Sequence, residues 1–133
     1  MPVIHSEIDV HGEEFAKNRD AMLAAVDSFR QIEQNCLNKA AEAKAKFEKR
    51  GQLLPRERLN LLLDPGAPFL ELSSLAGYKL HDDKDGTQAG GGIISGIGYI
   101  AGVRCLVTAS NSAIKGGTIS PTGLKKTLRL QQI

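Results

Sequence analysis

The sequence predicts an α/β protein in which a long helix precedes a region of strands and shorter helices. Residues 13 to about 50 carry apolar side chains at intervals of three and four, which is typical of one amphipathic helix. Residues 90–109 combine glycines with β-branched side chains, a composition that favours strands and tight turns. From Pro121 onward the helical interval returns. This order of helix, strands and helix indicates the α/β class.

The N-terminal helix is expected to stop at Gly51, because glycine enters the left-handed conformation without strain. At about 1.5 Å per residue the helix would span roughly 55 Å, longer than a domain of this size can cover. A helix of such length is more often a contact with another subunit than a core element. Residues 1–52 are therefore interpreted as a helical arm. Its apolar stripe consists of Met22, Val26, Phe29, Ile32, Cys36, Ala40, Ala43 and Phe47.

Short elements follow the arm. Pro55 suits the first position of a helix, and Asp64-Pro65-Gly66 closes that helix with a turn. We expect a short strand at 69–72, a solvated loop at 81–88 and a hairpin turn at 101–104.

The last predicted element is an amphipathic helix that runs from Pro121 to the last residue without a stop signal, as if cut within the helix. Its apolar side chains are Leu124, Leu128, Leu130 and Ile133.

Composition excludes several classes of function. Seventeen basic and fifteen acidic residues give a net charge of +2, which provides no footprint for nucleic acid or an anionic membrane. No apolar run approaches the roughly 20 residues of a membrane span. Acidic residues begin at Glu7, which argues against a transit peptide, so we expect a cytoplasmic protein. Cys36 and Cys105 are expected to be free thiols, and no catalytic triad or metal cluster is present.

Two glycine-containing segments invite a functional interpretation. The string from Gly96 to Ala101 fits a dinucleotide-binding pattern, but it leads into a second strand rather than a helix, which favours a structural role. Lys115-Gly116-Gly117-Thr118 follows an apolar strand and precedes a helix. Either this segment presents backbone N–H groups to an anion, or it is an ordinary strand-to-helix turn. Arg56 and Arg58 could hold a phosphate, although a solvated helix face is favoured.

Together these segments resemble the carboxyltransferase β subunits of biotin-dependent acyl-CoA carboxylases over residues 45–133. The resemblance rests on an ordered set of motifs: LPRERL, LLLDPG, FLEL, the glycine-rich hairpin, KGGT, Pro121 and the KK helix. The KGGT form at Lys115–Thr118 is typical of the methylcrotonyl-CoA and geranyl-CoA branch.

The resemblance implies a crotonase-like fold of β-β-α units, with residues 53–133 as the start of the N-terminal carboxyltransferase domain. It implies transfer of carboxylate from carboxybiotin to the γ-carbon of an unsaturated acyl-CoA. Biotin would be carried on an α subunit with biotin carboxylase and carrier functions, in an α6β6 hetero-oligomer with further β subunits. The family's oxyanion holes lie downstream of Ile133, so no catalytic residue is assigned and the fragment alone is expected to be inactive.

The resemblance also suggests a substrate. Methylcrotonyl-CoA enzymes generally carry aromatic residues after GGT, where this chain has Ile119 and Ser120, and a larger residue at Gly123. Smaller side chains predict a wider acyl pocket that admits geranyl-CoA, while Lys115, Gly116, Gly117 and Thr118, with Arg56 and Arg58, are predicted to bind CoA. The alternatives to a geranyl-CoA carboxylase are a methylcrotonyl-CoA carboxylase β subunit of leucine degradation and a non-catalytic assembly or CoA-binding fragment.

Overall fold

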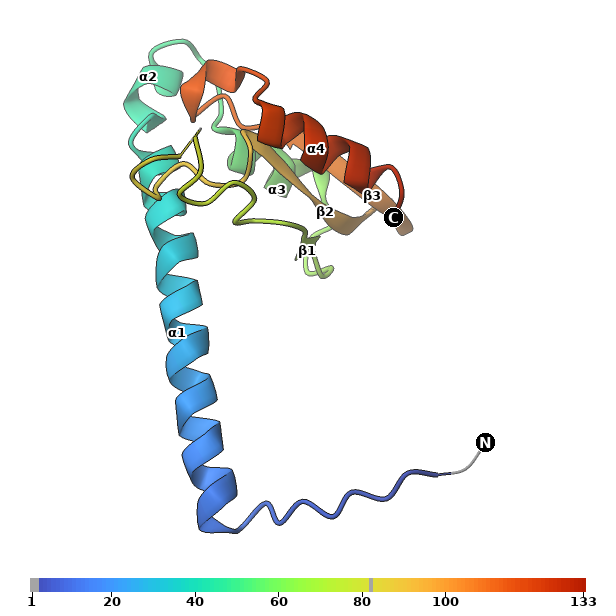
Figure 1. The fold of residues 1–133 in the computed structure, drawn as a ribbon. Coiled ribbons are helices and arrows are strands. Elements are labelled where there is room, and N and C mark those ends of the chain that lie inside the picture. The colour runs from blue at the N-terminus through green and yellow to red at the C-terminus, as the bar shows by residue number, and fades with distance from the viewer. Residues whose placement is uncertain (1–2, 82) are drawn as a thin grey trace. The chain divides into compact units, whose positions relative to one another are not determined.

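The computed structural model describes residues 3–81 and 83–133. The chain divides between Ile32 and Glu33 into two compact units. The expected succession of elements is present (Figure 1). In chain order the elements are α1 (Glu13–Ala41), α2 (Lys44–Glu48), α3 (Pro55–Leu62), β1 (Leu70–Glu71), β2 (Ile93–Ile100), β3 (Val103–Ser110), the 3-10 turn η1 (Lys115–Gly117) and α4 (Pro121–Leu130).

The N-terminal helix is interrupted where the sequence predicts continuity. The N–H group of Ala43 donates to Ala40 O, three residues back, at 3.3 Å, and this tighter turn separates α1 from α2. The predicted stop at Gly51 is confirmed, with φ +64°. Gly51 N donates to Glu48 O at 2.9 Å and Gln52 N to Phe47 O at 3.0 Å, the two hydrogen bonds of a Schellman motif.

Helix α3 begins at Pro55, as predicted, and ends beside the hairpin turn. Asp64, just after the helix, donates its N–H to Tyr99 O at 2.9 Å. Its carboxylate accepts hydrogen bonds from Ala101 N and Gly102 N, each at 2.7 Å. One side chain thus joins the end of α3 to the tip of the β2–β3 hairpin, although the two segments are 37 residues apart in sequence.

The sheet is antiparallel with the strand order β1-β2-β3. Ile93 pairs with Ser110 at one end of the hairpin, and Ile100 pairs with Val103 at the other. The turn is therefore centred on Ala101 and Gly102, one residue earlier than predicted, and both have positive φ, 51° and 76°.

The core lies between α3 and the hairpin. Leu59, Ile94 and Val107 are buried, and Leu63, Phe69, Ile100 and Cys105 pack against them. A Cβ atom at Gly98 would lie 2.6 Å from Leu63 Cδ2, and one at Gly96 would lie 2.6 Å from Phe69 Cζ. These glycines make room for core side chains, which confirms their structural interpretation.

The loop before β2 differs from its prediction as a solvated segment. Asp83 is only 2% exposed, and its carboxylate accepts hydrogen bonds from Lys79 N at 3.2 Å and Gln88 N at 2.8 Å. A buried carboxylate needs such donors, so Asp83 organises the loop around itself. Asp82 lies outside the described residues.

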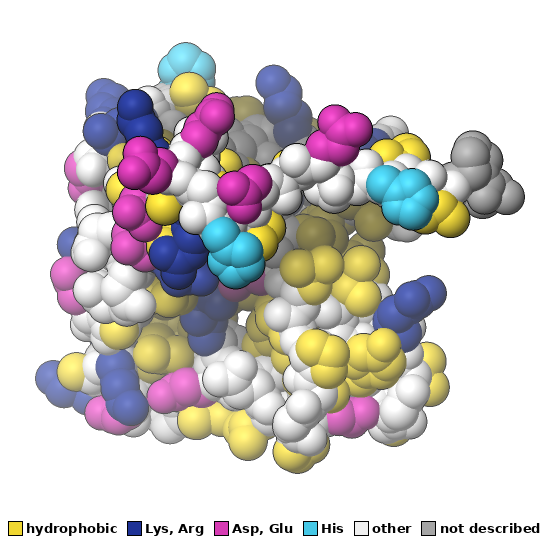
Figure 2. All heavy atoms as spheres, turned by 90° about the horizontal axis from the view of Figure 1, so that it is seen from below, with side chains coloured by type: hydrophobic (Ala, Val, Ile, Leu, Met, Phe, Trp, Pro, Cys, Tyr) yellow, Lys and Arg dark blue, Asp and Glu magenta, His cyan; other side chains and the backbone are white. Residues whose placement is uncertain are grey.

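At the other end of the chain, α4 stops at Leu130, three residues short of the predicted helix, and a turn follows at residues 131 and 132. Within the described residues no helix is long and apolar enough to cross a membrane. Figure 2 shows hydrophobic side chains exposed at the surface among charged ones. Exposed large hydrophobic residues include Met22, Leu23, Phe29, Leu61, Ile119, Leu124 and Leu128.

Candidate functional site

The segment Lys115–Thr118 forms a tight turn at the surface. Lys115, Gly116 and Gly117 have consecutive positive φ values of 50°, 66° and 81°. Gly117 N donates to Ile114 O at 3.2 Å, and both Thr118 N (3.3 Å) and Thr118 Oγ1 (2.8 Å) donate to Lys115 O. The expectation that both glycines turn their N–H groups outward is therefore wrong for Gly117. The exposed groups that remain for an anion are the Lys115 ammonium and the Gly116 backbone.

Lys115 stands between two depressions of the surface. On one side lies a groove of about 300 Å³, which also contains Lys39, whose ammonium is paired with Glu42 at 2.8 Å. On the other side is a hollow of about 10 Å³, lined in part by Gly91, Gly92, Thr118 and Ser120. The hollow has room for about one water molecule. A ligand of coenzyme size would have to lie over the exposed turn and the larger groove.

The three predicted acyl-pocket residues occupy different environments. Ile119 is 78% exposed. Ser120 is half-buried and caps α4, because its Oγ accepts a hydrogen bond from Gly123 N at 3.0 Å. Gly123 is buried, and a Cβ atom there would overlap the carbonyl oxygen of Gly91. Gly123 thus lets α4 approach the Gly91 backbone, while its part in an acyl pocket stays a prediction.

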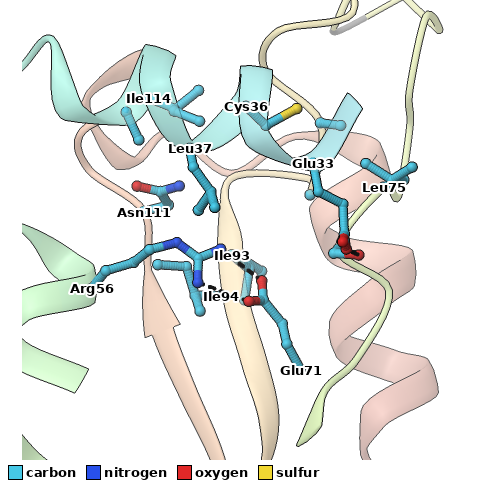
Figure 3. Close-up of a pocket in the computed structure, with 14 residues that line it drawn as sticks. Glu33, Cys36, Leu37, Arg56, Glu71, Leu75, Ile93, Ile94, Asn111 and Ile114 are labelled. Carbon is cyan, nitrogen blue, oxygen red and sulfur yellow. Dashed lines mark hydrogen bonds and ion pairs between the residues drawn. The ribbon is translucent and has the colours of Figure 1, made fainter. Parts of the chain in front are cut away.

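Arg56 forms an ion pair with Glu71. Its Nη1 and Nη2 donate to the two carboxylate oxygens of Glu71 at 2.7 and 2.9 Å, joining α3 to β1 (Figure 3). This pair lines a pocket of about 120 Å³ together with Asn111 and Glu33, the latter accepting from Ser74 Oγ at 2.6 Å. Both terminal nitrogens donate to Glu71, which gives Arg56 a structural role, and its contact with a phosphate stays a prediction.

Arg58 is not brought together with Lys115. It lines a separate hollow with Phe47, Leu53 and Ser112. Its predicted contact with CoA phosphate has no support from this placement, since Lys115 belongs to neither of the two hollows that Arg58 lines.

Sequence reasoning missed Lys126. Of the predicted apolar side chains of α4, Leu130 is buried as expected, but Leu124 and Leu128 are each 53% exposed. The other buried residues of the helix are Gly123 and Lys126. The Lys126 ammonium donates to Ile93 O at 2.8 Å and Gly90 O at 3.3 Å. Burial lowers its pKa to about 8. The available signal was its spacing of three from Gly123 and four from Leu130, which places all three on one side of the helix.

The two cysteines are free, as expected. Burial raises the pKa of the Cys36 thiol, which keeps it protonated near neutral pH. No group of three potential metal ligands occurs within residues 3–81 and 83–133.

Comparison with known proteins places this geometry in a family. The carboxyl transferase domain matches residues 46–133, about two thirds of the chain. The chain belongs to the carboxyl transferase domain family. The predicted resemblance to acyl-CoA carboxylase β subunits is thereby confirmed.

Members of the carboxyl transferase domain family resemble the chain beyond that region. The methylcrotonoyl-CoA carboxylase β chain of Drosophila melanogaster, described as probable and mitochondrial, is 42% identical over 98% of the chain and 22% of its own length. The chain thus spans about a fifth of the length of the curated relatives it matches.

Solved structures confirm the predicted crotonase-like fold. The β subunit of geranyl-CoA carboxylase from P. aeruginosa is 80% identical, with a TM-score of 0.88 over 98% of this chain and 24% of that subunit. A transcarboxylase 12S structure shares the fold with 23% identity and a TM-score of 0.66 over 84% of this chain and 22% of that one.

Proposed function

We propose that the chain is part of a carboxyltransferase β subunit that carboxylates the γ-carbon of geranyl-CoA within a biotin-dependent acyl-CoA carboxylase. The observation that carries this proposal is the 80% identity to a geranyl-CoA carboxylase β subunit over 98% of the chain. The methylcrotonoyl-CoA carboxylase β chain from Drosophila melanogaster is 42% identical over the same 98% of the chain. Residues 1–52 would form the arm, and residues 53–133 would begin the carboxyltransferase domain.

In this proposal the turn at Lys115–Thr118 binds the coenzyme A portion of the substrate. The exposed Lys115 ammonium would meet a phosphate, and Gly116 would allow close approach of the ligand to the backbone. Gly117 and Thr118 shape the turn through their internal hydrogen bonds. Ile119 would contact the acyl chain, since it is a large apolar side chain exposed directly beside the turn.

Biotin, carried by a partner α subunit, would supply the activated carboxylate. No described residue is assigned to the biotin ring, so the part that this chain plays is to bind and orient the acyl-CoA. We further propose that the complete protein assembles with that α subunit and with other β subunits, and that it acts in the cytoplasm.

Methylcrotonyl-CoA is the second candidate substrate, because the KGGT sequence at Lys115–Thr118 is shared by that branch and a methylcrotonoyl-CoA carboxylase β chain matches over 98% of this chain.

The substrate is tested with the complete β subunit and its biotin-bearing partner, assayed for carboxylation of geranyl-CoA and 3-methylcrotonyl-CoA. We expect kcat/KM to be at least tenfold higher for geranyl-CoA, a difference of about 1.4 kcal/mol in transition-state stabilisation. Efficient turnover of methylcrotonyl-CoA with little turnover of geranyl-CoA would rule out geranyl-CoA as the substrate.

In the same assay Ile119→Tyr should lower geranyl-CoA turnover selectively, because the exposed side chain can be enlarged without a clash. Gly123→Phe is unsuitable, since it would collide with Gly91.

The CoA site is tested separately with Lys115→Ala. Loss of the ammonium should raise the KM for the acyl-CoA by about three- to tenfold, or roughly 0.6–1.4 kcal/mol, with kcat nearly unchanged. Lys125→Ala is the matched control, because it removes the same charge from an exposed position on α4. Equal KM values for the two variants would exclude a phosphate contact at Lys115.

A further inference from the structure

Lys126 is a buried cation held by backbone oxygens. It lies in the middle of α4 and is 5% exposed. Its ammonium donates to Ile93 O at 2.8 Å and to Gly90 O at 3.3 Å. Within the described part of the chain no carboxylate lies at ion-pair distance from it, and the charged groups that influence it are Glu71 and Arg56, which are paired with each other.

The two carbonyl groups bracket an unusual turn. Gly90, Gly91 and Gly92 all have positive φ, at 100°, 66° and 72°. Glycine adopts this region without the strain that a side chain brings, and it is also the residue with the greatest freedom to leave such a conformation. One internal hydrogen bond closes the turn, from Ile93 N to Gly90 O at 3.2 Å, and contacts from outside support it. Ala76 O and Asn111 N hold its ends, at 2.9 Å to Gly90 N and 2.8 Å to Gly92 O.

The middle of the glycine turn rests against α4. The space that a side chain at Gly91 would need is taken by the backbone of Gly123, with Cα at 2.9 Å from the Cβ position. Gly91 and Gly92 also line the hollow that contains Lys115 and Thr118. The glycine turn and the Lys115–Thr118 turn are thus two walls of one depression, and Lys126 connects the first of them to α4.

Stability alone gives a poor reason for this lysine. An ammonium removed from water without a carboxylate partner costs free energy, and an apolar side chain of similar size is often at least as stabilising at such a position. What an apolar side chain cannot do is donate hydrogen bonds to Gly90 O and Ile93 O. The role of Lys126 is therefore to hold those two carbonyl groups in position.

We propose that Lys126 is a positioning residue that fixes the Gly90–Gly92 turn as one wall of the acyl-CoA site. This inference rests on the proposed function, because it takes the Lys115–Thr118 turn to be the place where the coenzyme binds. Lys126 itself does not contact the ligand. It acts through the glycine turn.

The test uses the complete carboxylase with its biotin-bearing partner, and Lys126→Met is compared with Lys125→Met. Both variants remove one charge from α4 and keep a long side chain, but Lys125 is exposed. Calorimetric titration with geranyl-CoA should give an affinity about tenfold weaker for Lys126→Met and unchanged for Lys125→Met, with kcat at saturating substrate nearly equal in both. The second readout is the pH dependence of the wild-type affinity, which can be measured even if Lys126→Met does not fold.

Burial lowers the pKa of Lys126 from 10.5 to about 8, so the ammonium loses its proton between pH 7 and pH 9. The neutral amine is a weaker donor, and wild type and Lys125→Met should both lose affinity severalfold across this range. Lys126→Met should be weak and insensitive to pH.

Wild-type affinity that stays constant from pH 7 to pH 9, or a Lys126→Met variant that binds as wild type does, would overturn the positioning role alone. A wild-type enzyme that neither binds nor carboxylates any acyl-CoA would instead overturn the proposed function, and this inference with it.

Discussion

Arg56 and Arg58 lie two residues apart on α3 and have different surroundings. Arg56 forms a two-pronged ion pair with Glu71, whose side chain is 23% exposed. Arg58 lines an open hollow and makes no ion pair within the described residues. The sequence made both candidates for a phosphate, because a helix places residues i and i+2 on different faces but does not say which of those faces will be covered.

This difference predicts opposite results from two neighbouring alanine substitutions. Arg56→Ala should destabilise the protein by about 1–3 kcal/mol, because it leaves the carboxylate of Glu71 partly buried without its partner. Arg58→Ala should change stability by less than about 0.5 kcal/mol. Denaturant unfolding of the complete subunit, followed in parallel for both variants, provides the measurement. Equal unfolding midpoints for the two variants would show that the ion pair contributes nothing to stability. A raised KM for the acyl-CoA in Arg58→Ala alone would support Arg58 as a phosphate ligand.

At the scale of elements, local rules predicted α3, α4 and the three strands beyond the arm. Pro55 starts α3, Gly51 ends α2, and the β-prone segments form the expected hairpin. What local rules could not supply was the partner of each element. Asp64 reads as a turn residue in sequence, but its carboxylate holds the tip of the hairpin through Ala101 and Gly102. That role depends on a contact 37 residues away.

Helix α4 shows the same limit more sharply. The spacing of its leucines correctly predicts an amphipathic helix, but only in part which side chains are covered: Leu130 is buried, whereas Leu124 and Leu128 are each 53% exposed. A leucine at Gly123 could not approach Gly91, whereas a glycine can, so the close contact of two backbones decides the orientation. Lys126 is buried as a consequence, and no pattern of hydrophobicity identifies a buried lysine. The candidate site was likewise predicted only in part. The sequence predicted the turn at Lys115–Thr118 but not the neighbouring turn at Gly90–Gly92.

At the scale of the whole molecule, the first part of α1 carries apolar side chains that its own unit leaves exposed. Met22 is 65% exposed and Phe29 47%. Both belong to the stripe that continues through Cys36 and Ala40, which are covered in the second unit. A helix that keeps its apolar interval where nothing covers it is typical of an interface with another chain. We therefore retain the prediction that the arm contacts another subunit.

The arm is tested by the double substitution Met22→Glu with Phe29→Glu. Two carboxylates in a desolvated apolar contact should reduce assembly strongly, so light scattering of the complete β subunit, alone and with its partner, should show smaller particles than wild type. The control is Asn18→Glu with Ser28→Glu, which adds the same charge at exposed polar positions of α1. If both double variants assemble to the wild-type mass, the apolar stripe of the arm is not an interface. If both fall apart equally, the added charge rather than the loss of apolar contact is responsible.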